Sequence, residues 1–510
     1  MTTKNRVLAG VTALLSTLVL SSCTSALSQP AAETAADAGG TIRIGAAQDL
    51  NPQAFYSGLV THTGLVYDTL TSYRPDNLEP QPRLATSWTV AEDGRTVTLN
   101  LREDVTFHDG RPFTSQDVEF SLVNYSDPAY AGQLFRVAQA ITSYDSSDPH
   151  RITLQLAHPV NNLFDLFENV PVIDRNTVEQ LRAGEHYNGT GPFRFEEWKP
   201  GAHTSYEANP DYWDGAPKVD GVEVAVVPDP QTQVSQLRAG QLDLISAQPR
   251  DVEALGDDPA FNVVSLEGTS NVTYIGANVT APGLEDPRLR EAISLAVDRE
   301  RILEEVYRGR ARASSLPWPD YSPAHDPAAE LPSRDLAAAE ALVEDVGEIP
   351  EIPLTIPSGS LTYSSVAEIV ADNLAEIGVR TRIEPLDPAA NLSHLINGTY
   401  PGLWIYGHTF AQYNPSTLVI AAFPFNSEKN ASNFRDEGYS RHAAESWRTS
   451  DPDSPEARDA YAALNRDLLD HNFLIELSVV DTELLTAGSL HDVKWNKRGL
   501  YDLSDAYFTG

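Results

Sequence analysis

Side chains that can do chemistry are plentiful in this chain, but they do not stand in the patterns that catalysis needs. The sequence has no serine elbow of the form G-x-S-x-G, no zinc-binding H-E-x-x-H and no glycine–lysine pair for a phosphate loop. No G-x-G-x-x-G follows a predicted strand, and the twelve histidines are dispersed. The 72 acidic residues allow a glycosidase-like carboxylate pair, but so many acids produce such pairs by chance. We therefore predict a protein that is not an enzyme and that uses no metal and no cofactor.

The single cysteine, Cys23, ends a segment that is typical of a secretory signal. Lys4 and Arg6 supply positive charge, an apolar stretch runs from Val7 to Leu20, and small residues follow. This stretch is shorter than the ~20 apolar residues that span a bilayer. The ending L-S-S-C resembles a lipobox, in which the cysteine is lipidated and becomes the first mature residue. We expect residues 1–22 to be a lipoprotein signal peptide; the alternative is a plain secretory signal with an accidental cysteine.

The next segment, residues 23–40, is small and polar, and it has too few bulky apolar groups to form a core. It is predicted to be a flexible tether. No later stretch is apolar enough to cross a membrane. The folded part then starts near Thr41 and, at ~470 residues, is long enough for more than one core. We expect it to lie on the extracellular or periplasmic side of the cell membrane, held there by the lipid alone.

The charge balance excludes two classes of partner. The formal net charge is −36, and loss of Lys4 and Arg6 with the signal would make it −38. Such a chain repels nucleic acid and anionic lipid, so neither is expected to bind it. The acids are scattered along the sequence rather than gathered in one block, and most of them are expected to form a solvated surface.

Helix and strand patterns alternate along the folded part. Residues 41–45 and 95–101 alternate in the manner of half-buried strands, and residues 221–227 are typical of a buried strand. Asp286 and Pro287 are typical of a helix start. Apolar residues recur at helical spacing over 366–377, and Gly378 then precedes the alternating stretch VRTRI. A helix, a glycine and a strand in succession predict an α/β fold, a sheet covered by helices.

Several segments, taken in order, resemble one family. They are LVYDTLTSYRPD at 65–76, LEPQPRLATSW at 78–88, the stretch 93–122 with DGRTVTLNLREDVTFHDGRPF, NGTGPF at 188–193, NPDYWDG at 209–215, RAGQLD at 238–243, and DPRLREAISLAVDRERILEEVYRG at 286–309. Each is weak alone, but together they are similar to the extracellular solute-binding proteins of family 5, the peptide/nickel type that serves ABC importers. The motifs identify a scaffold and do not themselves mark a pocket.

The resemblance implies a periplasmic-binding-protein-like fold of type II with two lobes and an extra domain inserted in lobe one. Lobe one would comprise residues 41–62, 190–275 and 478–510, the inserted domain 63–189, and lobe two 276–477. Solute would bind in the interlobe cleft, which closes over it. The implied partners are a small-molecule or peptide solute and ABC permease subunits with their ATPases, and the protein is expected to be a monomer.

The resemblance also implies where the pocket lies. In this family a lobe-two strand and the loop after it reach the cleft, which here corresponds to LWIYGHTFAQYNPS at 403–416. Aromatic rings and amides in this segment suit an extended ligand, although two of the aromatic residues would equally fit a core strand. The predicted contacts there are Trp404, Tyr406, His408, Gln412, Tyr413 and Asn414. Further candidates are Phe55 and Tyr56 in an N-terminal loop, and Tyr274 and Asn278 on the strand that joins the lobes.

One position departs from the family pattern. Peptide binders often place an aspartate in this loop that pairs with the amino terminus of the peptide, and Gln412 occupies the corresponding position. A neutral amide cannot balance an ammonium in a dry cleft. Either the ligand lacks a free amine at this point, or another acid replaces the missing one. The function predicted is capture of a peptide or peptide-like solute for import. An oligosaccharide, an opine or a metal chelate is the alternative ligand, and a sensing lipoprotein or a secreted hydrolase the alternative role.

Overall fold

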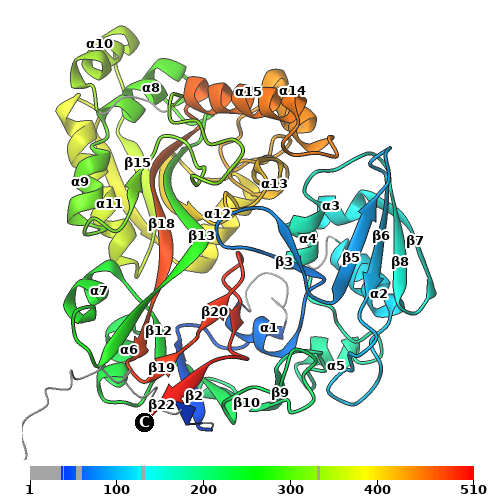
Figure 1. Ribbon diagram of the computed structural model, residues 1–510. Coiled ribbons are helices and arrows are strands. Elements are labelled where there is room, and N and C mark those ends of the chain that lie inside the picture. The colour runs from blue at the N-terminus through cyan, green and yellow to red at the C-terminus, as the bar shows by residue number, and fades with distance from the viewer. Residues whose placement is uncertain (1–35, 38, 53–59, 128–132, 330–333) are drawn as a thin grey trace, which may run out of the picture. The chain divides into compact units, whose positions relative to one another are not determined.

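Two long antiparallel strands rich in valine, threonine and leucine run through the centre of the described residues: β13 (Phe261–Ala277) and β18 (Leu474–Ala487). They belong to the computed structural model in Figure 1, which describes residues 36–37, 39–52, 60–127, 133–329 and 334–510. Phe261 of β13 pairs with Ala487 of β18, and the pairing continues to Gly276 of β13 and Leu474 of β18. We call these two strands the long pair.

Among the described residues, the long pair is the middle of an 11-stranded mixed sheet. At one end, β13 pairs with β17, which is followed by β15 and β16. At the other end, β18 pairs with β12, which is followed by β2, β11, β10 and β9, while β14 pairs with β18 separately. The bounds of these strands are β2 Thr41–Ala46, β9 Phe193–Lys199, β10 His203–Ala208, β11 Gly221–Val226, β12 Leu244–Ser246, β14 Arg312–Ala313, β15 Ile352–Pro357, β16 Thr381–Leu386 and β17 Leu403–His408.

Helices cover the β15–β16–β17 end of the sheet. They are α8 (Pro287–Ala296), α9 (Arg299–Glu305), α10 (Leu336–Val346) and α11 (Leu361–Glu376). The Asp286 side chain caps α8 by accepting from the Arg288 N–H, and Ser360 caps α11. Gly378 follows α11 with φ +80°, a conformation that favours glycine. Buried residues of α8, α9 and α11 form one core with β13, β15 and β17.

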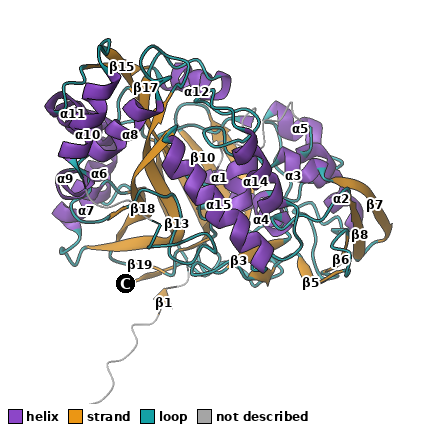
Figure 2. Ribbon diagram, turned by 90° about the horizontal axis from the view of Figure 1, so that it is seen from above, coloured by secondary structure: helices purple, strands orange, loops and turns teal. Residues whose placement is uncertain are grey.

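A separate four-stranded antiparallel sheet has the order β5-β6-β8-β7 among the described residues. Figures 1 and 2 both show it on the side of the large sheet away from α8–α11. Its α2 helix begins with a capping box between Thr114 and Asp117. The elements of this region are β3 Thr71–Tyr73, β4 Pro80–Pro82, β5 Ala85–Val90, β6 Thr96–Leu101, α2 Ser115–Tyr125, α3 Phe135–Gln139, β7 Ile141–Asp148, β8 Arg151–Leu156, α4 Leu163–Asn169 and α5 Val178–Ala183.

The other elements complete the two ends of the large sheet. Helices α6 (Pro230–Arg238) and α7 (Pro249–Leu255) supply buried residues to a small core shared with β12 and β18. Helices α12 to α15 follow β16 and β17 in the sequence: α12 Pro388–Asn397, α13 Pro415–Ala421, α14 Glu437–Trp447 and α15 Pro455–His471. The remaining elements are α1 Val60–Val66, β19 Leu490–His491, β20 Lys494–Trp495, β21 Tyr501–Asp502 and β22 Tyr507–Thr509.

Backbone pairing starts within the segment predicted to be the tether. Strand β1 (Ala36–Asp37) pairs with β22, and the Gly39 N–H donates to the Lys218 carbonyl at 2.9 Å. Residues 36–510 form one compact unit. The boundaries of lobe one, lobe two and the inserted domain within this unit stay predictions. So does the rest of the tether, of which residues 23–35 and 38 lie outside the described residues.

Candidate ligand-binding cleft

The long pair is irregular where the two ends of the sheet meet. Its register shifts between Leu266 and Asn271, so a short stretch of β13 bulges away from β18. Gly268 lies in this stretch with φ +82°, and a Cβ there would come within 2.2 Å of the Pro75 carbonyl oxygen. Only glycine allows so close an approach. The bulge therefore brings the strand pair against the loop that follows β3.

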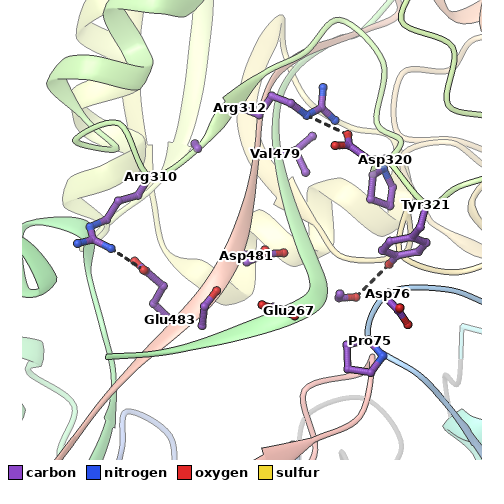
Figure 3. A pocket seen from close by; sticks show the side chains of 14 residues that line it. Pro75, Asp76, Glu267, Arg310, Arg312, Asp320, Tyr321, Val479, Asp481 and Glu483 are labelled. Atoms are coloured by element: carbon purple, nitrogen blue, oxygen red, sulfur yellow. Dashed lines mark hydrogen bonds and ion pairs between the residues drawn. The ribbon is translucent and has the colours of Figure 1, made fainter. Parts of the chain in front are cut away.

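A cavity of about 410 Å³ opens at this irregularity (Figure 3). Its walls come from four separate stretches of chain: residues 75–76, 265–268, 310–321 and 479–483. In the predicted division these stretches belong to the inserted domain, lobe one, lobe two and lobe one again. Its volume lies within the ~300–1,000 Å³ typical of small-molecule sites. We call it the acidic cavity, because acidic side chains are the most numerous charged groups on its lining.

Acidic side chains dominate the lining of the acidic cavity. Five of the residues are acids: Asp76, Glu267, Asp320, Asp481 and Glu483. Two are arginines, and each has an acid of its own: Arg310 pairs with Glu483 at 2.7 Å, and Arg312 pairs with Asp320 at 3.5 Å. Five carboxylates against two guanidiniums leave a formal charge of −3 on the lining.

Asp481 and Glu267 lie next to each other in the middle of the cavity, between the two arginine pairs (Figure 3). The pKa of Asp481 is raised, chiefly because the surrounding protein withdraws the carboxyl from water and further because Glu267 is near. Glu483 raises it as well, and Lys497 opposes the rise. The cavity is thus a place where an added positive charge would be stabilised.

Tyr321 separates the acidic cavity from a buried polar region behind it. Its hydroxyl lies 3.1 Å from the Gly268 carbonyl and 3.1 Å from the Gln412 carbonyl. The Lys497 ammonium lies 3.8 Å from the centre of the Tyr321 ring and donates to the Pro75 carbonyl at 2.8 Å. Tyr321 therefore joins the loop that holds Gln412 to the cavity wall.

Buried acids of α4 lie on the far side of this wall. Glu168 accepts hydrogen bonds from the backbone N–H groups of Tyr73 and Lys497. Burial raises the pKa of the Glu168 carboxyl and lowers the pKa of the Lys497 ammonium. Asp165 accepts from the Tyr73 hydroxyl at 2.6 Å and from the Thr417 hydroxyl at 2.5 Å. Its carboxyl is fully buried, which raises its pKa to about 6.

The strand residues among the predicted contacts occupy the sheet interior in this conformation. Tyr274 and Trp404 have no exposed surface, and the Trp404 indole N–H donates to the Tyr274 hydroxyl at 3.3 Å. Tyr406 is half-buried, with its ring centre 5.7 Å from that of Tyr363. Asn278 holds a turn by donating to the Tyr400 carbonyl and accepting from the Thr280 N–H.

The loop residues among the predicted contacts are nearer to the acidic cavity, although none is on its lining. Gln412 is buried directly behind Tyr321, and its amide donates to the Lys497 carbonyl at 2.9 Å. Tyr413 is buried beside the Tyr73 ring, and Asn414 donates to Asp165 through its backbone and its side chain. His408 is buried against Phe425, and its Nε2 lies 3.6 Å from a Glu476 oxygen. Whether these residues touch ligand stays a prediction.

The family model for bacterial extracellular solute-binding proteins, family 5 (middle region), matches residues 79–430. The chain belongs to that family. It is 28% identical over 378 residues to di/tripeptide-binding protein 2 of Pseudomonas aeruginosa, a match that covers 67% of this chain and 70% of the relative. The family's proteins bind peptides or other small solutes outside the cell and work with ABC permeases. Those relatives are transport proteins rather than enzymes.

Solved structures confirm the expected periplasmic-binding-protein-like α/β fold. The Helicobacter pylori periplasmic binding protein DppA, in complex with the peptide STSA, superposes with a TM-score of 0.80 at 20% identity and covers 92% of this chain and 98% of its own. Campylobacter jejuni NikZ, in complex with Ni(L-His), gives 0.79 at 21% identity, covering 90% and 97%. At these identities the likeness shows the fold alone.

The residues that line the acidic cavity of this family 5 protein were not among the contacts predicted from its sequence. The one available signal was the pair Asp481 and Glu483, which stand two apart and so share a strand face. Glu267, Tyr321 and the two arginines carry no such pattern. Phe55, Tyr56 and Cys23 lie outside the described residues.

Two further cavities lie beside the long pair. Val480 and Thr482 line one of about 300 Å³ but not the acidic cavity, whereas Asp481 and Glu483 line both. The second, of about 670 Å³, adjoins it and is lined by the starts of α6, α7 and α11. We call them the rear cavities. The charged residues of the larger one are balanced: Asp229 and Glu305 against Arg250 and Arg308.

Two findings bound the chemistry of the described residues. No group of three or more His, Cys, Asp or Glu side chains in that part of the chain is arranged to hold a metal ion. In the same part, every helix is too short or too polar to cross a membrane.

Proposed function

We propose that this family 5 protein captures a peptide or peptide-like solute in the cleft that contains the acidic cavity and delivers it to the permease subunits of an ABC importer. The observation that carries the proposal is the composition of the cavity wall, which takes residues from each of the three predicted parts of the chain. A solute held there touches both lobes at once, so its binding energy favours their closure. No bond of the solute needs to break in this role.

We keep, as part of the proposal, the division of the chain that the family resemblance implies. Lobe one comprises residues 41–62, 190–275 and 478–510, the inserted domain 63–189, and lobe two 276–477. The long pair is the link between the lobes, because β17 pairs with one half of it and β12 with the other. Lobe movement would then bend the two strands near the irregular stretch at Gly268.

The peptide assignment is supported by relatives rather than by a bound ligand. The Pseudomonas aeruginosa relative is named a di/tripeptide-binding protein, and the Helicobacter pylori structure holds a peptide. A volume of about 410 Å³ suits a short solute. For this chain, a solute of a few residues is the assignment that these observations favour.

The test is to identify the solute that stays with the purified protein. Native mass spectrometry of the gently purified full chain should show a mass increment that disappears after unfolding and refolding. Calorimetry of the refolded protein with the released peptide should restore binding. A refolded protein that binds a sugar, an opine or a metal chelate but no peptide would contradict the peptide assignment.

We also propose that the protein is anchored by a lipid on Cys23 and acts as a monomer. The support is the signal pattern that ends at Ser22. Cys23→Ala should move the protein from the membrane fraction to the soluble fraction. Retention of Cys23→Ala on the membrane would contradict the anchor.

A further inference from the structure

Three side chains meet at the end of the acidic cavity where the three proposed parts of the chain come together. Tyr321 and Gln412 belong to the proposed lobe two, and Lys497 belongs to the proposed lobe one. Lys497 is 1% exposed and Gln412 is 3% exposed, so water has little access to their polar atoms. Tyr321 is half-buried and lines the cavity. We call these three residues the clasp.

Three contacts of the clasp cross from the proposed lobe two to the proposed lobe one. The Tyr321 hydroxyl donates to the Gly268 carbonyl at 3.1 Å. The centre of the Tyr321 ring lies 3.8 Å from the Lys497 ammonium, a distance typical of a cation–π contact. The Gln412 amide donates to the Lys497 carbonyl at 2.9 Å. Separation of the two lobes at this end of the cavity would break all three contacts.

Lys497 also attaches the proposed inserted domain to the clasp. Its ammonium donates to the Pro75 carbonyl at 2.8 Å, and its backbone N–H donates to the Glu168 carboxylate at 3.2 Å. Pro75 and Tyr321 lie at the same end of the acidic cavity (Figure 3). One buried lysine of lobe one therefore contacts both lobe two and the inserted domain.

The clasp gives a physical reason for the amide at position 412. The Lys497 backbone carbonyl is an acceptor, so the side chain that meets it has to be a donor, and an ionised aspartate has no donor. Gln412 supplies one through Nε2, while its Oε1 has no hydrogen-bond partner among the described residues. An aspartate here would set two buried acceptors against each other, which is unfavourable.

We propose that the clasp holds lobe one, lobe two and the inserted domain together and stabilises the closed arrangement without any contribution from the solute. The inference rests on the proposed division of the chain and is independent of the peptide assignment. One hydrogen bond shifts an equilibrium by about 2- to 10-fold, so three contacts acting together favour closure strongly. A solute that binds between the lobes then supplies less of the free energy of closure.

The experiment measures the distance between the lobes in the refolded full chain with no solute added. Cys23 is the only cysteine, so a Cys23→Ser background accepts two spin labels, at Ala254→Cys on α7 and Ala375→Cys on α11, both exposed positions. Pulsed electron paramagnetic resonance should give one dominant distance in this background. Tyr321→Phe and Gln412→Leu should each raise the ratio of a second, open population to the closed one by at least about 3-fold.

Two matched variants remove the same groups inside a single proposed lobe. Tyr439→Phe removes a hydroxyl that donates to the Phe425 carbonyl within lobe two. Gln233→Leu removes an amide that donates to the Val227 carbonyl within lobe one. Both variants lose one buried hydrogen bond, yet they should keep the distance distribution of the background. Urea unfolding of all four variants shows how much stability each loses, so that lobe opening is separated from general destabilisation.

The outcomes test the clasp apart from the proposed function. A distance distribution that neither Tyr321→Phe nor Gln412→Leu changes overturns the inference, and so does an equal change in the two matched variants. A background protein that is mainly open without solute overturns it as well. No solute takes part in these measurements, so the clasp can fail while the peptide assignment stands, and it can stand if the solute proves to be of another class.

Discussion

The two faces of the long pair differ in how they connect the parts of the chain. On the face of the acidic cavity, α4 and the start of α13 meet through Asp165, whose buried carboxyl accepts from Tyr73, Asn414 and Thr417. On the rear face, one hydrogen bond joins Thr362 to Gln248 at 3.3 Å, and one ion pair joins Arg308 to Glu253 at 3.5 Å. The contacts on the first face are buried, and those on the second are partly exposed. The comparison indicates that one face fixes the arrangement while the other can open at small cost.

The largest effect is expected from Asp165→Ala. The substitution leaves the donors of Tyr73, Asn414 and Thr417 buried without an acceptor, which should lower the free energy of unfolding by about 3–5 kcal/mol. Urea unfolding followed by tryptophan fluorescence measures the change.

The matched rear variant is Thr362→Val, which removes the bond to Gln248. Because that bond is partly exposed, the loss should be about 0.5–1 kcal/mol. Equal losses of unfolding free energy in Asp165→Ala and Thr362→Val would contradict the distinction between the two faces.

A pH experiment sharpens the same comparison. Burial raises the pKa of Asp165 from 3.8 to about 6, so between these values the folded protein binds more protons than the unfolded chain. The stability that Asp165 contributes is present below pH 3.8 and is lost as the pH rises through about 6. Asp165→Asn should therefore gain about 2.4 kcal/mol of unfolding free energy relative to wild type between pH 4 and pH 7.

The measurement is the unfolding free energy of both proteins at several pH values in this interval. A constant difference between wild type and Asp165→Asn would show that the pKa of Asp165 is not raised in the folded protein. Glu305→Gln, at a rear cavity, serves as the charge-matched control.

A pair of bulky substitutions separates the two faces by function. Ser265 is an exposed residue on the lining of the acidic cavity, and Ser265→Trp should fill that space and weaken solute binding about 100-fold, or ~2.7 kcal/mol. Thr482→Trp places the same bulk in a rear cavity and should change binding less than about 3-fold. Calorimetry with the solute identified by mass spectrometry measures both, and a stronger effect of Thr482→Trp would move the site to the rear face.

Local signals in the sequence predicted the elements whose ends are set by neighbouring residues. The capping pattern of Thr114 and Asp117 and the Asp286–Pro287 start are both confirmed at helix starts. The helix predicted over 366–377 begins earlier, at Leu361, because Ser360 caps it through the Tyr363 N–H. The strand after Gly378 is confirmed as β16. In each case the information lies within a few residues of the element it determines.

The acidic cavity could not be predicted in this way. Its walls join residues 75–76, 265–268, 310–321 and 479–483, which are far apart in the sequence. The face on which Glu476 lies depends on one extra residue in β18, and the two-residue alternation of a strand does not reveal where such a residue falls. The family resemblance led instead to the loop at 403–416, which the structure places behind Tyr321.

The position of β18 in the sheet also determines when the protein can complete its fold during synthesis. This strand lies between β13 and β12, so without it the large sheet is two separate halves. It begins only at Leu474, late in the sequence. During synthesis, therefore, each half of the sheet has an unpaired edge strand until β18 has been made. Such an order of assembly keeps the chain incompletely folded while it is being made, the state in which a polypeptide can still be threaded through a narrow export channel.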